Sequence, residues 1–138
     1  MNLHCELYDR EKHYGMIALW WRRHGFPEIP AELLGFGVVV RMDGVPRAAV
    51  FGFQDRFAER LAVLEFAVAN PGNKPRQSII AIQTAVECAK ELLAKRGAIC
   101  IMSFFENGGL NRLMGKCGFT SNEKGIESMV YVNNGGEQ

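Results

Sequence analysis

One carboxylate in an apolar stretch of the chain has the surroundings of a general base. Glu65 lies within RLAVLEFAVAN, where apolar residues populate both faces of an expected central strand. Burial there would raise the pKa of the Glu65 carboxyl toward the working range of a general base. Strand alternation predicts that Phe66 and Val68 point away from Glu65. A second interpretation stays open, in which Glu65 faces solvent or pairs with an arginine such as Arg41 or Arg47.

Cysteine and histidine spacing does not favour a metal site. The chain has four widely separated cysteines: Cys5, Cys88, Cys100 and Cys117. Their apolar neighbours indicate buried free thiols in a reducing compartment. His13 and His24 are three turns apart on one expected helix, too far to share an ion. We therefore predict that the protein uses no metal.

Charge and hydropathy exclude several classes of partner. A net charge of +1 provides no attraction toward nucleic acid or an anionic membrane. The first residues alternate apolar and polar, unlike a signal peptide, and no apolar run approaches membrane-spanning length. We expect a cytoplasmic protein that binds neither nucleic acid nor membrane.

The first elements that must position Glu65 are a strand and a helix. Residues 3–7 alternate in the manner of a half-buried strand. Asp9 can then cap a helix that Gly25 ends. The expected core-facing stripe of this helix is His13, Met16 or Ile17, Trp20, Trp21 and His24.

A three-strand antiparallel meander follows. Apolar runs at 36–42 and 45–53 flank Asp43-Gly44, a strong hairpin signal. The strand that carries Glu65, at 61–69, is stopped by Pro71.

A long helix begins after GNKP and ends at Gly97. Its expected buried stripe is Ile79, Ile82, Val86, Ala89 and Leu93, widened by Ala85 and Leu92. Further strands are predicted at 98–104 and 126–132. We expect the strand at 61–69 to diverge from the strand at 98–104 at their carboxyl ends, which would leave a cleft.

This order predicts one domain over residues 1–132 and a flexible tail over residues 133–138. The fold class is α/β (α+β), with a mixed, mostly antiparallel sheet of six to seven strands flanked by helices.

Two stretches carry a family resemblance. The first is LEFAVANPGNKPRQSIIA, which joins the strand of Glu65 to the long helix. The second is NGGLNRLMGKCGF, in which Asn107, Leu110, Leu113, Lys116, Gly118 and Phe119 fall in register with a family pattern. With the order of elements from Phe36 to Tyr131, they resemble the GNAT superfamily of acetyl-CoA-dependent N-acetyltransferases, in particular its short phage- or prophage-type members.

The resemblance implies a cofactor site at the start of the long helix. In the family this helix opens with Arg/Gln-x-x-Gly-x-Gly/Ala, and its backbone amides bind the cofactor pyrophosphate, because a helix N-terminus offers unpaired N–H groups and a positive dipole end. Arg76 matches the first position and Ala81 the last, whereas Ile79 stands at the position of the first glycine. The implied cofactor-binding residues are Ala67, Val68, Ala69, Lys74, Arg76, Gln77, Ser78, Ile79, Ile80, Ala81 and Asn107.

In the second stretch, the resemblance implies that Gly118 makes a helix-ending turn and that Phe119 packs beneath the sheet. Met114 occupies the position of a tyrosine that, in many family members, protonates the departing thiolate. A thioether cannot donate a proton.

The implied activity is transfer of acetyl from acetyl-CoA, the co-substrate, to an amine on a small molecule or on a protein lysine or N-terminus, with Glu65 as the base. Whether the protein forms a homodimer stays an open question. The alternative is a catalytically degenerate GNAT-like protein that binds another macromolecule, which Ile79, Met114 and the glycine pair Gly108-Gly109 favour.

Overall fold

The computed structural model describes residues 1–55, 57, 60–103, 112 and 114–120. In chain order the elements are β1 (Leu3–Leu7), α1 (Arg10–His24), the 3-10 helix η1 (Ala31–Leu33), β2 (Phe36–Met42), β3 (Val45–Gln54), β4 (Leu61–Ala69), α2 (Pro75–Lys95) and β5 (Cys100–Ser103). The predicted strands at 36–42 and 61–69 have the observed bounds, and β3 extends one residue beyond the predicted 45–53. Helix α2 ends two residues before Gly97, and β5 begins two residues later than the predicted strand at 98–104.

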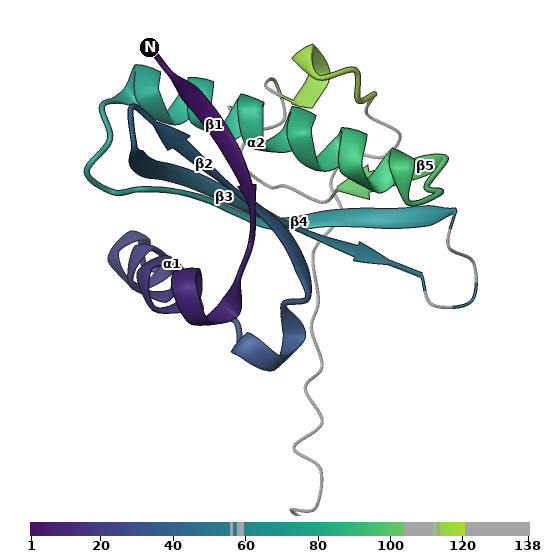
Figure 1. The fold of residues 1–138 in the computed structure, drawn as a ribbon, viewed down its shortest axis with the longest axis horizontal. Coiled ribbons are helices and arrows are strands. Elements are labelled where there is room, and N and C mark those ends of the chain that lie inside the picture. The colour runs from purple at the N-terminus through teal and green to yellow at the C-terminus, as the bar shows by residue number, and fades with distance from the viewer. Residues whose placement is uncertain (56, 58–59, 104–111, 113, 121–138) are drawn as a thin grey trace, which may run out of the picture.

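The described strands form one mixed sheet in the order β1-β2-β3-β4-β5. Neighbouring strands from β1 to β4 are antiparallel, and β5 runs parallel to β4. The mixed, mostly antiparallel sheet is thus confirmed, with five strands in the described residues rather than six to seven. The predicted strand at 126–132 lies outside them. Helix α1 covers one face of the sheet and α2 the other (Figure 1).

The two faces carry separate apolar cores. Below α2, buried residues of β2, β3 and β4 pack against the helix: Val38, Val40, Val50 and Leu64 with Ala85, Val86 and Leu93. On the α1 face the alternate residues of the strands pack against α1: Val39, Phe51 and Val68 with Ile17, Trp20 and Trp21. Residues that neighbour each other along a strand therefore belong to different cores.

Helix α1 begins and ends as its sequence predicts. The Asp9 carboxylate accepts a hydrogen bond from the Glu11 backbone N–H at 3.2 Å, and Gly25 ends the helix with a φ of 76°. Trp20 and Trp21 are buried, as predicted. His24 is exposed, so its predicted place in the buried stripe is wrong. It lies in the last turn, where its ring reaches the end of β4 instead of the core.

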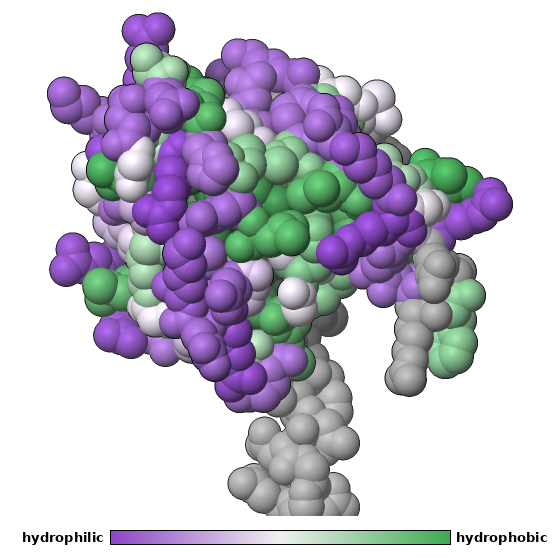
Figure 2. Space-filling model, in the orientation of Figure 1, coloured by the Kyte–Doolittle hydropathy of each residue, from purple (hydrophilic) through white to green (hydrophobic). Residues whose placement is uncertain are grey.

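Strand β1 is more exposed than predicted. Leu3 and Leu7 are 39% and 55% exposed, because β1 is the edge strand and only Cys5 among its apolar residues packs against the α2 core. Figure 2 shows apolar surface in the middle of the viewed face, framed by hydrophilic residues.

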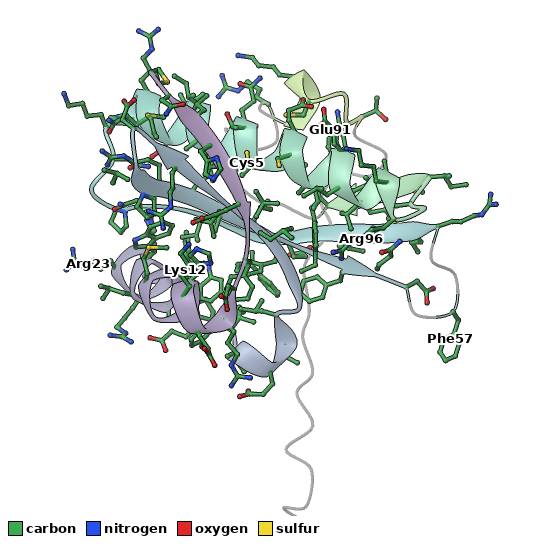
Figure 3. All side chains as sticks on the ribbon, viewed as in Figure 1. Cys5, Lys12, Arg23, Phe57, Glu91 and Arg96 are labelled. Carbon is green, nitrogen blue, oxygen red and sulfur yellow. The ribbon has the colours of Figure 1, made fainter. Side chains whose placement is uncertain are left out.

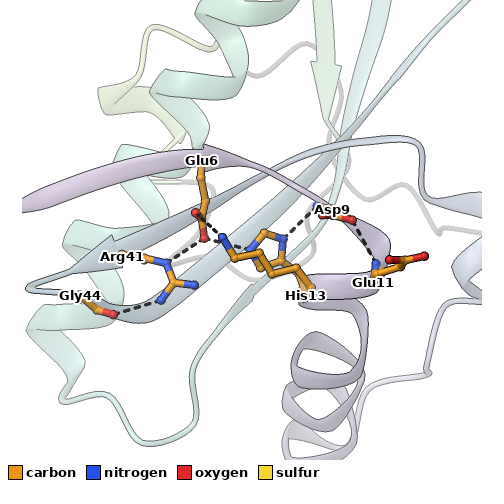
Figure 4. Close-up of polar contacts among 7 residues, drawn as sticks. Glu6, Asp9, Glu11, His13, Arg41 and Gly44 are labelled. Atoms are coloured by element: carbon orange, nitrogen blue, oxygen red, sulfur yellow. Dashed lines mark hydrogen bonds and ion pairs between the residues drawn. The ribbon is translucent and has the colours of Figure 1, made fainter.

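A polar network centred on the buried His13 fastens α1 to the sheet (Figure 4). His13, 1% exposed, accepts the Asp9 backbone N–H at Nδ1 (2.9 Å), so its proton resides on Nε2, which donates to Glu6 at 2.9 Å. Glu6 also accepts from Arg41 Nε at 2.8 Å and from Lys12 Nζ at 3.3 Å. Burial opposes ionisation of Glu6, but these three donors outweigh it and lower the pKa of its carboxyl to about 2. This network ties β1, α1 and β2 together.

Within the described ranges, none of the helices has the length and apolar character needed to cross a membrane.

Candidate functional site

Strand β4 contains a bulge next to Glu65. In the pairing with β3, Ala49 lies opposite Val68 and Phe51 lies opposite Glu65. Two β4 residues therefore stand against one residue of β3, which leaves an unpaired residue and bends the strand. Phe66 has a φ of +59°, a conformation that a residue with a bulky side chain rarely adopts. Such strain recurs at functional sites.

The bulge changes which side chains share a face with Glu65. Directly opposed residues of paired strands point to the same side, and Phe51, the partner of Glu65, belongs to the α1 core. Phe66 and Val68 also pack in the α1 core. The prediction that these two residues point away from Glu65 is therefore wrong. The extra residue at the bulge reverses the alternation and brings Glu65 and Phe66 to one face.

Aromatic rings pack on the same face of the sheet as this half-buried carboxylate. The Phe53 and Phe66 rings meet edge to face, with centroids 5.8 Å apart. Trp21 meets Phe66 in the same manner at 6.5 Å, and its ring lies 5.8 Å from that of Phe51. The α1 face near the bulge thus combines a cluster of aromatic rings with the carboxylate of Glu65.

The two arginines considered as partners of Glu65 both donate hydrogen bonds to groups of the framework. Arg41 donates to Glu6 and to the Gly44 carbonyl, and the Arg47 Nη1 donates to Asn73 Oδ1 at 3.1 Å. Arg41 thereby links β2 to β1, and Arg47 links β3 to the loop after β4.

The loop after β4 is fastened to β3 by asparagine side chains. Asn70 donates from Nδ2 to the Pro46 carbonyl, and Asn73 donates from Nδ2 to the Arg47 carbonyl, both at 2.9 Å. Asn70 also accepts the Gly72 N–H at 2.9 Å, which closes the turn. The role of these two asparagines was not predicted from the sequence, although the Asn-Pro-Gly-Asn composition is a turn signal. Their bonds hold the start of α2 close to the end of β4.

The first turn of α2 has the features of an anion site. Pro75 begins the helix, and the Gln77 side chain accepts the Lys74 N–H at 2.8 Å. The N–H groups of Arg76 and Gln77 have no carbonyl four residues earlier within the helix, so they can donate to a ligand. Lys74 and Arg76 are exposed beside them. These donors and charges fit the pyrophosphate of coenzyme A.

Ile79 lies in the same turn and is 53% exposed. Its predicted place in the buried stripe is therefore wrong. The buried stripe of α2 begins at Ala81 and Ile82, which shows that the first turn extends past the apolar face of the sheet.

The structure places the other predicted cofactor residues on several surfaces. Ala67 and Ala69 are partly buried and Ala81 is fully buried on the α2 face, where Ile80 also packs, whereas Val68 is buried on the α1 face. Ser78 is half-buried and its hydroxyl accepts from Asn73 at 3.2 Å. Asn107 lies outside the described residues.

Helix α1 also contacts the end of β4. His24 Nε2 donates to the Ala69 carbonyl at 2.8 Å, and its ring stacks on Phe26 with centroids 5.2 Å apart. The pairing of β4 with β5 is recorded from Leu61–Cys100 to Leu64–Ser103. The predicted divergence of the two strands beyond this point involves residues outside the described ranges and stays a prediction.

The residues around Gly118 form a helix end, as predicted. Gly118 has a φ of +89°, and the Phe119 N–H donates to the Met114 carbonyl at 3.1 Å. Phe119 is half-buried against the α2 core. Met114 is 3% exposed in the same core, so its thioether contributes apolar packing.

Cys5 and Cys117 are held in the protonated thiol form, which is a poor nucleophile. All four cysteines are free. Burial, followed by the hydrogen bond with Glu87, raises the pKa of Cys117 to about 11, and burial with the neighbouring Cys88 raises the pKa of Cys5 to about 12. Cys100 is exposed at the start of β5, so the prediction of a buried thiol is wrong there. Within the described ranges, no three metal-ligating side chains of the His, Cys, Asp and Glu types gather into a site.

Comparison with solved structures identifies the fold. An aminoglycoside acetyltransferase from an uncultured soil metagenomic sample aligns with a TM-score of 0.69 and 11% identity, covering 95% of this chain and 97% of its own. Glucosamine-6-phosphate N-acetyltransferase from Arabidopsis thaliana aligns with a TM-score of 0.64 and 14% identity, covering 96% of this chain and 100% of its own. A GNAT-family protein from Novosphingobium aromaticivorans aligns with a TM-score of 0.65 and 19% identity, covering 84% of this chain and 51% of its own.

These identities are too low to carry more than the fold. No family model and no curated protein matches the sequence. The chain therefore has the fold of GNAT acetyltransferases, and its own chemistry must be argued from its residues.

Proposed function

We propose that this protein is an N-acetyltransferase that moves acetyl from acetyl-CoA to an amine on a small molecule, a protein lysine or a protein N-terminus. The observation that carries the proposal is the bulge of β4. Beyond the bulge, β4 leads to the start of α2, which Asn73 holds to β3 and whose free N–H groups suit a pyrophosphate. At the bulge itself, the Glu65 carboxylate lies on the α1 face. Solved acetyltransferases of the same fold act on aminoglycosides and on glucosamine 6-phosphate, which supports an amine acceptor.

Each part of this site has a role in the proposed reaction. The free backbone amides of Arg76 and Gln77, with the Lys74 and Arg76 side chains, bind the pyrophosphate, and the pantetheine arm runs beside Ala67–Ala69. A backbone N–H freed at the bulge polarises the thioester carbonyl. Glu65 accepts the proton that the attacking ammonium group must lose.

Binding of acetyl-CoA is the first test. A ligand that binds only the folded protein stabilises it by RT ln(1 + [L]/Kd), or about 2.7 kcal/mol at 100 times Kd. We expect acetyl-CoA to raise the melting temperature and Glu65→Gln to keep that shift while losing acetyl transfer. If millimolar acetyl-CoA leaves the melting temperature of the wild-type protein unchanged, the enzyme proposal is wrong.

A second candidate is a non-catalytic protein of this fold that binds another macromolecule. The exposed Ile79 in the first turn of α2 and the buried Met114 favour it, because the first crowds a phosphate and the second cannot supply a proton. Absence of acetyl-CoA binding in both the wild type and Ile79→Gly would favour this candidate.

A further inference from the structure

We infer that the acceptor is a primary monoamine with an aromatic or other apolar side chain, bound beside Glu65 on the α1 face of β4. The inference rests on the proposed function and names its substrate class. It differs from the polycationic substrates of the aminoglycoside acetyltransferases that share the fold.

The exposed part of this face is aromatic. Phe53 and Phe66 are both half-buried, and their rings meet at 89°. Edge-to-face pairs of this kind extend readily to a third ring or to an aliphatic group. An ammonium group that approaches Glu65 would also pass these ring faces, which attract cations.

The side chains buried next to these rings are aromatic as well. Phe51, the partner of Glu65 across the strands, is fully buried, and the Tyr8 ring meets it edge to face at 4.9 Å. A Cβ atom at Gly37 would lie 2.7 Å from Cδ1 of Phe51, so the ring lies across β2 only because this position is glycine. The ring arrangement around Glu65 is thus built into three strands.

The charges near this face disfavour a polycation. Helix α1, which covers the face, carries four Lys or Arg side chains, and three of them, Arg10, Lys12 and Arg22, are paired with carboxylates. Carboxylates on the neighbouring segments are already paired: Glu6 with His13, Arg41 and Lys12, Glu28 with Arg22, and Glu32 with Arg10. A substrate with several ammonium groups would therefore find few unpaired carboxylates for them on these segments.

The reaction on a monoamine balances without any further group. Glu65 takes one proton from the ammonium, and the freed lone pair forms the nitrogen–carbon bond to the acetyl carbon. The carbon–sulfur bond of the thioester then breaks, and the thiolate of coenzyme A leaves. The nitrogen loses its second excess proton to solvent, which gives the neutral amide, and solvent protonates the thiolate. A single amine suffices, and the rest of the acceptor can be apolar.

The test compares kcat/KM for phenethylamine, spermidine and kanamycin, measured as release of the coenzyme A thiol by the full-length protein. We expect phenethylamine to be favoured at least about tenfold over both polycations. Loss of a ring contact should lower kcat/KM for phenethylamine about 10- to 100-fold in Phe53→Ala, with little change in the acetyl-CoA-induced melting shift. Phe53→Leu keeps an apolar side chain of similar volume and therefore controls for misfolding of Phe53→Ala. It should retain most of the preference for phenethylamine over the polycations.

Phe57 supplies a matched control, because its ring is 93% exposed and projects from the loop between β3 and β4, away from the body of the molecule (Figure 3). Phe57→Ala should leave the ratio of phenethylamine to spermidine unchanged. Acetyl transfer that favours spermidine or kanamycin would overturn the inference and leave the proposed function intact. Failure to acetylate any amine despite acetyl-CoA binding would overturn both.

Discussion

Glu65 and Phe66 are consecutive in the chain, yet both side chains lie on the α1 face of β4. In a regular strand they would point to opposite faces. The bulge that unites them places an ionisable group in an aromatic environment and shifts the following residues, so that Ala67 and Ala69 face α2. One irregular residue thus defines both the proposed acceptor face and the path proposed for the cofactor.

The backbone at Phe66 predicts an unusual order of stability. A φ of +59° favours glycine over alanine, whereas in regular strands glycine is the weaker residue. Phe66→Gly should therefore be more stable than Phe66→Ala by about 1 kcal/mol in urea unfolding. At Val63, in the regular part of β4, the same pair of substitutions should show the opposite order. Equal or reversed stability at residue 66 would contradict the bulge geometry.

The start of α2 predicts how coenzyme A binding depends on charge and bulk. Arg76→Glu should weaken binding, and more strongly at low salt, because exposed charges are screened by ions. Lys95→Glu, at the other end of the helix, is the matched control.

Ile79→Gly should tighten binding of coenzyme A and should lower helix stability by about 1 kcal/mol. Leu19→Gly in α1 is the control: it should lower stability by a similar amount and leave binding of coenzyme A unchanged. Calorimetric titration with coenzyme A measures the affinity of the Arg76 and Ile79 variants. Tighter binding by Arg76→Glu would exclude pyrophosphate from this turn.

The Glu6 network predicts a pH dependence of stability. Its carboxyl has a pKa of about 2 in the folded protein and about 4.5 when unfolded, so its stabilisation is present above pH 4.5 and is lost as pH falls toward 2. Glu6→Gln should lower the free energy of unfolding by roughly 1–3 kcal/mol at pH 7 and by progressively less below pH 4.5. The exposed Glu32 provides the control, since Glu32→Gln should have little effect. A constant difference between the wild type and Glu6→Gln across this range would refute the assignment.

Two tyrosines form a matched pair for hydrogen-bond energetics. The buried Tyr8 hydroxyl has no hydrogen-bond partner among the described residues, whereas the Tyr14 hydroxyl donates to the Ile29 carbonyl at 2.7 Å. Tyr8→Phe should raise the free energy of unfolding by about 1 kcal/mol, and Tyr14→Phe should lower it by about 0.5–1.5 kcal/mol. Equal losses for both variants would show that Tyr8 has a partner in solution.

The helix end at Gly118 predicts a contrast between two glycines. Gly118→Val should lower the free energy of unfolding by more than about 1 kcal/mol, because its φ of +89° is unfavourable for a side chain. Gly115 lies inside the same helix with open space around its Cα, so Gly115→Ala should be neutral or stabilising. An unchanged denaturation midpoint for Gly118→Val would contradict the turn.

The elements themselves were predictable from local patterns. Asp9 and Gly25 mark the ends of α1, and the turn at Asp43-Gly44 has positive φ values at both residues, as this dipeptide favours. The long stripe of α2 was recognisable by its spacing, except at Ile79, where burial depends on how far the sheet extends below the helix. Such signals depend on a few neighbouring residues, so the sequence alone was sufficient to determine them.

The arrangement around Glu65 was decided only by the tertiary structure. A bulge arises from the register between β3 and β4, which involves residues about 15 positions apart, and no local pattern marks Phe66 as the residue that adopts positive φ. The same holds for Arg47, which holds Asn73 across the sheet, and for His24, which reaches Ala69 from another element. The sequence determined that a carboxylate lies in an apolar strand next to a helix start. Long-range pairing decided which face it shares, and with which rings, because side-chain direction in a strand depends on register rather than on residue type.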